Sequence, residues 1–345
     1  MSSGDSNLSA DEIALYDRQI RLWGMAAQAR MRSAKVLLIN LGSIGTEITK
    51  NIVLSGIGNL TLLDDHTVTE EDLGSQFFLS KENVGYKRLE VTKDRIQELN
   101  PRVNLTYDVG KFKEKDAEYF KQFDLIIGTE LSTLETIELN KITRRFNIPL
   151  YIAGSNGLFA YIFVDLVQFD AVDEKLKSSV PVEIGRISSN KEVIEVNVRI
   201  DEDDSKKIYE KVTTRHHYKT FEDVLQAASL KDKLNRRQLK RLSGAVPLTF
   251  AKFNLQNNQA CPTSEELRKS MQAISNKFGV PVENIKDEYF EQFANQSGIE
   301  FAPVSAVIGG AVAQDVINVF GKRQSPICNF IIFDGITLDM PIYEF

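Results

Sequence analysis

A short glycine turn is the first feature of this sequence that could bind a ligand. Residues 40–45 read NLGSIG and follow the apolar run KVLLI, so they lie between a predicted buried strand and a predicted helix. Gly42 and Gly45 occupy the second and third glycine positions of the pattern G-x-G-x-x-G, whereas the first is Asn40. Amides at a helix N-terminus attract phosphate, and glycine lets the backbone approach it closely. Taken alone, the turn predicts either a nucleotide site or only tight packing of strand on helix.

An acidic residue stands where a nucleotide site would need one. Asp64 ends the predicted strand LTLLD, 19 residues after Gly45, and acids at this place commonly bond ribose hydroxyls. An NAD-dependent oxidoreductase is the generic interpretation of these two features. That chemistry needs a catalytic pair such as His with Asp or Tyr with Lys, and we identify none opposite the turn.

The surrounding elements predict an α/β protein with a doubly wound, mainly parallel sheet. Short apolar runs such as FDLIIG, PLYIAG and AYIFVDL alternate with helical patterns, and the helix after the glycine turn repeats Ile44, Ile48 and Ile52 at a spacing of four. Ser9 and Glu12 predict a capping box that opens a helix running toward Trp23.

The pattern divides the chain into three parts. We expect a disordered tail over 1–8, one α/β domain built from 9–170 and 301–345, and a mostly helical insert over 171–300. Within the insert, VIEVNVRI is the one predicted strand, and Thr263 with Glu266 predicts a second capping box.

Composition excludes several classes of function. A net charge of −6 argues against a general nucleic-acid binder, and two cysteines form neither a disulfide framework nor a zinc cluster. The polar, acidic start does not suit a secretory signal. The apolar stretch 149–169 is broken by glycines and Asp165, so we expect strands there and no membrane partner.

Several motifs in one order identify a resemblance. The segments YDRQIRLWG, SGIGNLTLLDDHTVTEEDLGSQFF, NVGYKR and EFAPVSAVIGGAVAQDVINVFGK are similar to the Rossmann-like adenylation fold of ubiquitin-like-protein activating enzymes and their bacterial sulfur-carrier relatives. Chain length and the lack of a catalytic-cysteine domain most resemble the small subunits of the heterodimeric SUMO-activating enzymes. The small subunits of the NEDD8-activating enzymes are the nearest alternative.

Against this family the chain departs from the pattern in one pocket. Besides Asn40, the motif SNLxRQ reads EDLGSQ, which places Asp72 and Ser75 where the family has an asparagine and an arginine. Arg88 replaces a lysine, and Glu130 replaces the magnesium-binding aspartate. The resemblance therefore implies an inactive adenylation domain, with Gly42, Gly45, Asp64, Asp72, Ser75, Arg88 and Glu130 as remnants. We expect this chain to bind no cofactor and no metal.

The resemblance also implies a role for Arg18. In this family the arginine of the Y-[DN]-R-Q-I motif reaches the ATP phosphates of a paired subunit, so Arg18 is the expected catalytic residue, acting in trans. ATP and magnesium would be bound by that large catalytic subunit, which would also make most contacts with SUMO. A self-sufficient homodimeric adenylyltransferase and a scaffold without catalytic role are the alternatives.

Other features are interpreted more simply. We expect Arg21 to pair with a nearby acid, Cys328 to be buried and Cys261 to be exposed without catalytic function. The basic segment 236–242 predicts a solvated helix face or an import signal. Gly309 and Gly310 inside one helix predict close packing against the sheet or near a subunit boundary. The family implies a location in the nucleus, with the cytoplasm as a second one.

Overall fold

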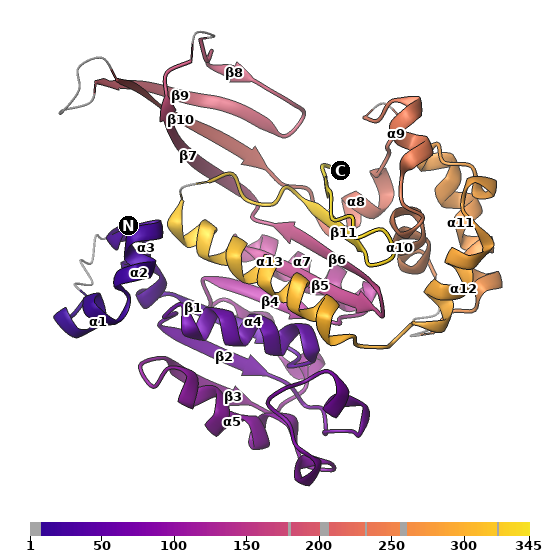
Figure 1. Ribbon diagram of the computed structural model, residues 1–345, viewed down its shortest axis with the longest axis horizontal. Helices are drawn as coiled ribbons and strands as arrows, with labels where there is room; N and C mark the ends of the chain where they lie inside the picture. Colours follow the sequence, from indigo (N-terminus) through magenta and orange to yellow (C-terminus); the bar gives the residue numbers. More distant parts are fainter. Residues whose placement is uncertain (1–7, 179–180, 201–206, 232, 256–260, 323) are drawn as a thin grey trace.

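The computed structural model describes residues 8–178, 181–200, 207–231, 233–255, 261–322 and 324–345 (Figure 1). An eight-stranded sheet has the order β12-β11-β6-β5-β4-β1-β2-β3. Strands β3, β2, β1, β4 and β5 run parallel, and β6, β11 and β12 add antiparallel pairs at one side. The strand bounds are β1 Lys35–Ile39, β2 Asn59–Leu63, β3 Asn104–Asp108, β4 Leu125–Thr129, β5 Leu150–Asn156, β6 Phe159–Asp165, β11 Phe330–Asp334 and β12 Ile342–Tyr343. The predicted α/β, mainly parallel fold is confirmed.

Both faces of the sheet are covered, which explains the unbroken apolar runs of its central strands. Along β1, Val36 and Leu38 join one buried cluster while Leu37 and Ile39 join the other, as the two-residue period of a strand requires. One face is packed by α4 (Ser43–Leu54), α5 (Arg88–Leu99) and α13 (Ala302–Gly321), and the other by α7 (Thr133–Phe146) and the later helices.

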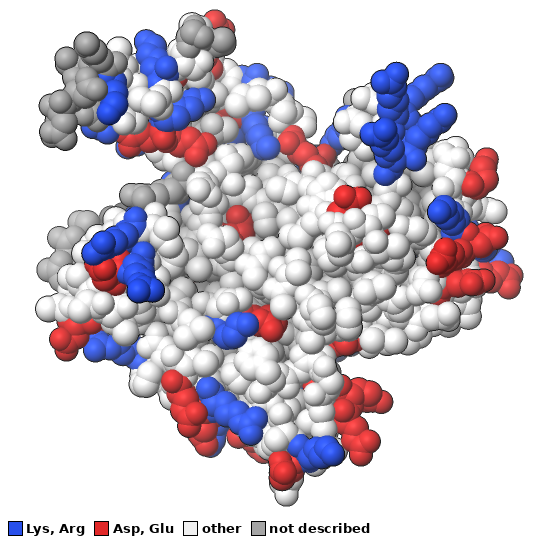
Figure 2. All heavy atoms as spheres, in the orientation of Figure 1, with Lys and Arg blue, Asp and Glu red and all other residues white. Residues whose placement is uncertain are grey.

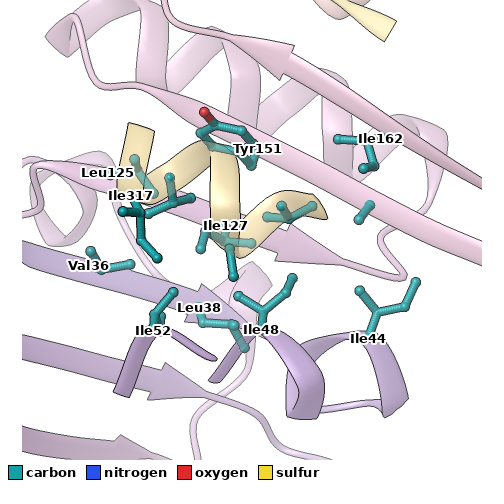
Figure 3. Close-up of a cluster of buried hydrophobic side chains, with 14 of the residues drawn as sticks. Val36, Leu38, Ile44, Ile48, Ile52, Leu125, Ile127, Tyr151, Ile162 and Ile317 are labelled. Carbon is teal, nitrogen blue, oxygen red and sulfur yellow. The ribbon is translucent and has the colours of Figure 1, made fainter. Parts of the chain in front are cut away.

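Figure 3 shows how the predicted row of isoleucines on α4 packs against the sheet. Ile44, Ile48 and Ile52 of α4 point toward strand side chains such as Leu38 and Ile127, and none of the five is more than 1% exposed. Each such buried aliphatic side chain contributes about 1.5–3 kcal/mol through loss of apolar surface from water. This face of the sheet therefore holds α4, and with it the glycine turn, in one position.

The two glycines of α13 have different surroundings. A Cβ on Gly309 would lie 2.5 Å from Cβ of Glu47 on α4, whereas a Cβ on Gly310 would meet nothing within 4 Å. Gly309 is thus closely packed, but against α4 and not against the sheet as predicted, while Gly310 has no close neighbour among the described residues. By length and composition α13 is the one described helix that could cross a membrane, but most of it is buried against α4 and the sheet, as in a core helix.

The N-terminal segment forms two short helices where one was predicted, and a third follows them. The Ser9–Glu12 capping box opens α1 (Ala10–Leu15) as expected, but Tyr16 separates it from α2 (Asp17–Trp23), which α3 (Met25–Ser33) follows. Tyr16 is 2% exposed, and its hydroxyl accepts a hydrogen bond from Asn100 Nδ2 at 2.8 Å. The helix is interrupted at Tyr16 because the side chain of this residue is buried in the core. Residues 1–7 of the predicted disordered tail lie outside the described residues.

The insert differs from the prediction. Four strands of this part of the chain form a second, antiparallel sheet of order β7-β10-β9-β8, with the bounds β7 Gln168–Leu176, β8 Gly185–Arg186, β9 Lys191–Ile200 and β10 Ile208–His217. The prediction of a mostly helical insert over 171–300 is therefore wrong for its first part. Strands such as QFDAVDEKL are half exposed and carry charges on both faces, so the apolar alternation that identifies a strand is weak.

The second part of the insert is helical, as predicted. Its helices are α8 Phe221–Ala227, α9 Arg236–Arg241, α10 Ala245–Phe253, α11 Ser264–Phe278 and α12 Asp287–Asn295. The Thr263–Glu266 capping box at the start of α11 is confirmed. After α12 the chain returns to the large sheet through α13 and β11, which pairs with β6. The domain boundaries themselves stay a prediction.

Candidate functional site

The glycine turn keeps the backbone shape of a phosphate-binding turn. Asn40 has φ 66°, a left-handed conformation that asparagine tolerates better than most residues, and this accounts for its presence at a glycine position. Its Nδ2 donates to the carbonyl of Thr129 at 2.8 Å, and Thr129 Oγ1 donates back to the Asn40 carbonyl at 2.6 Å. A Cβ on Gly45 would lie 2.3 Å from the Asn40 oxygen, so Gly45 is needed for packing alone.

A carboxylate of the chain itself occupies the anion position at the start of α4. The backbone amide of Ser43 donates to both oxygens of Glu300, at 3.1 and 3.0 Å, and Ser75 Oγ donates to Oε2 at 3.1 Å. A Cβ on Gly42 would lie 2.4 Å from Glu300 Oε1. The amides of the first helical turn attract an anion, and here the first of them, that of Ser43, already donates to Glu300. A phosphate in this place would clash with that carboxylate and be repelled by its charge.

Asp64, the predicted ribose-binding acid, is buried and hydrogen-bonded within the chain. Asp64 is 2% exposed, and its oxygens accept hydrogen bonds from the Leu41 amide (2.8 Å), His66 Nδ1 (2.7 Å) and Arg88 Nη1 (3.0 Å). Burial opposes ionisation of Asp64, but the hydrogen bond from His66 and the charge of Arg88 outweigh it and hold its pKa at about 2. The same Asp64 contact raises the pKa of His66. No oxygen of Asp64 is left for a ribose.

Arg88 is held between two acids and is not directed at a phosphate. Its Nη2 donates to Asp72 Oδ1 at 3.1 Å, in addition to its bond with Asp64. Asp72 also accepts from the Thr69 amide and from Gln76 Nε2, both at 2.8 Å. The guanidinium is therefore neutralised within the chain. Asp64, Asp65 and His66 are the one group of potential metal ligands found among the described residues, but Arg88 already supplies the cation there.

Glu130 lies at the end of β4, in the left-handed region with φ 53°. The amide and hydroxyl of Ser155 donate to its Oε1 at 2.9 and 2.8 Å. The side chain of Glu130 is exposed on the cavity side, yet the protein packed around its carboxyl and then the charge of Glu300 raise its pKa to about 7. A carboxyl that resists ionisation is a poor ligand for magnesium.

These residues border a cavity of about 740 Å³ at the carboxyl ends of β4 and β5. Its wall includes five acids, which are Glu71, Asp72, Glu130, Glu135 and Glu300. Lys252 is the one lysine of the described lining, and its Nζ donates to Asn156 Oδ1 at 2.9 Å. Carboxylates this numerous repel a triphosphate, so the residues present do not suit ATP.

The structure thus brings the predicted remnants into one region. Arg88 binds Asp64 and Asp72, while Ser75 and Glu130 bond Glu300 and Ser155. Sequence reasoning missed Glu300, His66 and Lys252. Glu300 is separated from Ser43 by 257 positions, and no local pattern links the two. Lys252 lies in a helix that is apolar elsewhere, so its place at the end of the sheet had no signal in the sequence.

Arg18 and Arg21 lie on the same short helix, α2, and have different partners. Arg21 Nε contacts Asp17 Oδ2 at 3.0 Å, as predicted. Arg18 is exposed, and among the described residues no side chain forms an ion pair with it. Because α2 precedes β1, it lies toward the amino ends of the parallel strands, away from α10 and α12 beside the cavity (Figure 1). Arg18 is therefore on the wrong side to serve its own pocket.

A groove of about 290 Å³ lies next to Arg18, between α2, α4 and α13. Its lining includes Gln19, Trp23, Leu54, Gly310 and Gln314. Leu54 is 46% exposed, and the missing side chain of Gly310 opens the groove. The lining also includes Asn51, Ser55, Ala313 and Ile317, and such a mixture of polar and apolar residues is typical of non-obligate protein interfaces.

The two cysteines and the basic segment were interpreted as unconnected with catalysis. Cys261 lies next to the cavity wall, since its Sγ would be 3.5 Å from a Cβ on the lining residue Gly298, whereas Cys328 is not among the lining residues. Cys261 is exposed and Cys328 buried, as predicted, and burial raises the pKa of Cys328 to about 11. The basic segment forms the exposed helix α9, where Lys and Arg side chains gather in Figure 2.

Comparison with known proteins decides the family. The model of the ThiF family matches residues 16–344. The chain belongs to the ThiF family. It is 58% identical to the DNA damage tolerance protein RHC31 of Saccharomyces cerevisiae over 340 residues, covering 98% of both chains. It is 32% identical to rad31 of Schizosaccharomyces pombe, covering 99% of both, and 31% identical to SUMO-activating enzyme subunit 1 of Homo sapiens, covering 95% of this chain and 93% of that one.

Two solved structures have the same fold at low identity. E. coli MccB with succinimide has a TM-score of 0.53 at 16% identity, covering 99% of this chain and 73% of that chain. PaaA has a TM-score of 0.55 at 16% identity, covering 100% and 85%. These likenesses support the Rossmann-like adenylation fold and no finer statement.

Proposed function

We propose that this chain is the non-catalytic small subunit of a heterodimeric SUMO-activating enzyme. It pairs with a large subunit that adenylates the C-terminus of SUMO with ATP and then forms the thioester. Full-length relatives named SUMO-activating enzyme subunit 1 support this proposal. Neither described cysteine suits acyl transfer: Cys328 is buried with a raised pKa, and Cys261 Sγ donates to the Ser297 carbonyl at 3.2 Å.

One contrast carries the proposal. The carboxylate of Glu300 fills the anion position of this chain's own pocket, while the exposed Arg18 on the opposite side has no ion pair among the described residues. Arg18 would therefore act on ATP held by the partner. A guanidinium can donate two parallel hydrogen bonds to phosphate oxygens and stabilise the charge that moves onto pyrophosphate.

The groove between α2, α4 and α13 supplies the surface for pairing. It shares α2 with Arg18, so seating a partner in the groove would bring that partner near the guanidinium. The partner binds ATP and magnesium and makes most contacts with SUMO. We propose residence in the nucleus and also the cytoplasm, without nucleic-acid or membrane partners.

Modifier-dependent exchange of pyrophosphate into ATP tests the proposal. We expect no exchange with this chain alone, full exchange with the large subunit, and a large loss when the pair carries Arg18→Ala. Exchange by the chain alone would instead establish a self-sufficient homodimer. Unchanged exchange with Arg18→Ala would leave a scaffold. Exchange with NEDD8 in place of SUMO would assign the chain to the other modifier.

A further inference from the structure

The cavity at the carboxyl ends of β4 and β5 has an excess of negative charge that the subunit role leaves unexplained. Of its five acids, Asp72 pairs with Arg88 and Glu135 with Lys113. Glu130 and Glu300 form no ion pair with a described residue: the first is bonded to Ser155 and the second to backbone and hydroxyl groups of the α4 start. Glu71 also forms no ion pair with a described residue, so three of the five acids lack a paired cation.

The nearest basic group does not neutralise them. Lys252 lines the cavity, yet the one hydrogen bond of its Nζ is to the Asn156 amide oxygen. Burial lowers the pKa of Lys252, and the charge of Glu130 offsets this only in part. The pKa of Glu130 is raised because the surrounding protein removes water from its carboxyl group and because the charge of Glu300 repels the ionised form.

Beside its acids, Lys252 and several serine, threonine and asparagine side chains, the cavity lining contains four aromatic residues, Phe159, Tyr161, Phe253 and Phe293. The rings of Phe159 and Phe293 lie 5.1 Å apart, and Tyr161 meets Phe253 edge-on at 4.9 Å. A Cβ on Gly154 would lie 2.6 Å from the Tyr161 ring, so the absence of a side chain there gives the ring its place in the wall. Aromatic faces attract cations, and this attraction grows when the site is shielded from water.

We propose that this cavity binds a small organic cation, a protonated amine carried on an apolar body. The amine would lie between Glu130 and Glu300, and the body would contact the aromatic wall. The volume of about 740 Å³ lies in the range of small-molecule sites, which is about 300–1,000 Å³. The carboxylates that exclude a nucleotide are then the groups that select the ligand. This inference rests on the cavity alone, so it can fail while the proposed subunit role holds.

Three probes of equal body and different charge test the proposal on the full chain. Phenethylammonium, 2-phenylethanol and 3-phenylpropionate are titrated by calorimetry at pH 7. We expect the ammonium to bind at least about tenfold more tightly than the alcohol, and the carboxylate not to bind. Binding of the cation should release protons, since a positive charge lowers the pKa of Glu130. Titration in buffers of different ionisation enthalpy measures that release.

Matched variants separate this site from general attraction to an acidic protein. Glu130→Gln and Glu300→Gln should each weaken ammonium binding about tenfold, as expected for loss of a charged hydrogen bond. Glu118→Gln, at an exposed acid on α6 (Ala117–Phe120), should leave binding unchanged. If Glu300→Gln does not fold, Glu130→Gln decides. Equal affinity for the alcohol, no binding at about 1 mM, or binding unaffected by Glu130→Gln would overturn the proposal.

Discussion

The two ends of the parallel strands in this molecule have opposite characters. At the carboxyl ends, every remnant of a nucleotide site is bonded to another part of the chain: Glu300 to the start of α4, and Asp64 to Arg88. Near the amino ends, α2 presents Arg18 to solvent beside an open groove. A chain of this fold can therefore lose its own ligand site when its own side chains occupy the ligand positions. An exposed arginine on the opposite side still keeps the potential to act on a partner.

The largest effect is expected from the residue without a partner. Arg18→Ala in the heterodimer should lower SUMO-dependent pyrophosphate exchange by about 10²–10³, at or below the low end of what trans-acting arginines contribute in GTPases, because the partner site has its own cations. Arg18→Lys should recover only part of the rate, since an ammonium cannot make paired hydrogen bonds.

Arg21→Ala is the matched control on the same helix. Its ion pair with Asp17 is exposed, and such pairs are worth about 0–1 kcal/mol. The rate should stay within about twofold. An equal loss from both variants would mean that α2 matters as a folded element and that Arg18 has no special role.

The adjacent glycines of α13 should separate folding from pairing. Gly309→Ala places a Cβ against Glu47 and should destabilise the isolated chain by about 1–3 kcal/mol, as overpacking does. Gly310→Leu fills the groove instead, so it should leave unfolding by urea nearly unchanged and weaken association with the large subunit. Analytical ultracentrifugation measures that association. Undiminished pairing by Gly310→Leu would exclude the groove from the interface.

Removing the internal anion should have a moderate effect on stability. Glu300→Ala leaves the first amide of α4, that of Ser43, without its acceptor and should cost about 0.5–2 kcal/mol, the usual range for a lost helix cap. Glu300→Gln keeps one acceptor oxygen and should cost less. Urea unfolding of both variants provides the measurement, and equal stability of Glu300→Ala and the unmodified chain would contradict the cap role.

The smallest effect concerns pH. The pKa of Glu130 is raised from 4.5 to about 7, so its contribution to stability is fully present below 4.5 and is lost as the pH rises through 7. Glu130→Gln should remove this part of the pH dependence, with its relative gain in thermal midpoint greatest above pH 7. Parallel melting curves of the two proteins between pH 5 and 8 would contradict the assignment.

Local patterns predicted much of the fold because their partners are close in sequence. The Ser9–Glu12 and Thr263–Glu266 capping boxes and the Ile44–Ile48–Ile52 stripe depend on residues three or four apart. The predicted strand VIEVNVRI is confirmed as part of β9, whereas its neighbour β7 was not recognised because that half-exposed strand has no clear alternation. One predicted helix became two because Tyr16 is drawn toward Asn100, a contact that sequence spacing cannot reveal.

The sequence by itself determined which residue types could no longer handle ATP, since Asp72, Ser75 and Glu130 differ chemically from what phosphate and magnesium need. Only the tertiary structure decided which side chains of the chain itself occupy the former ligand positions of the pocket. Glu300 reaches Ser43 across 257 positions, and Arg88 meets Asp64 and Asp72 from a different helix. Such contacts depend on how the packed sheet and helices place distant backbone segments, and that placement is set by burial over the whole core.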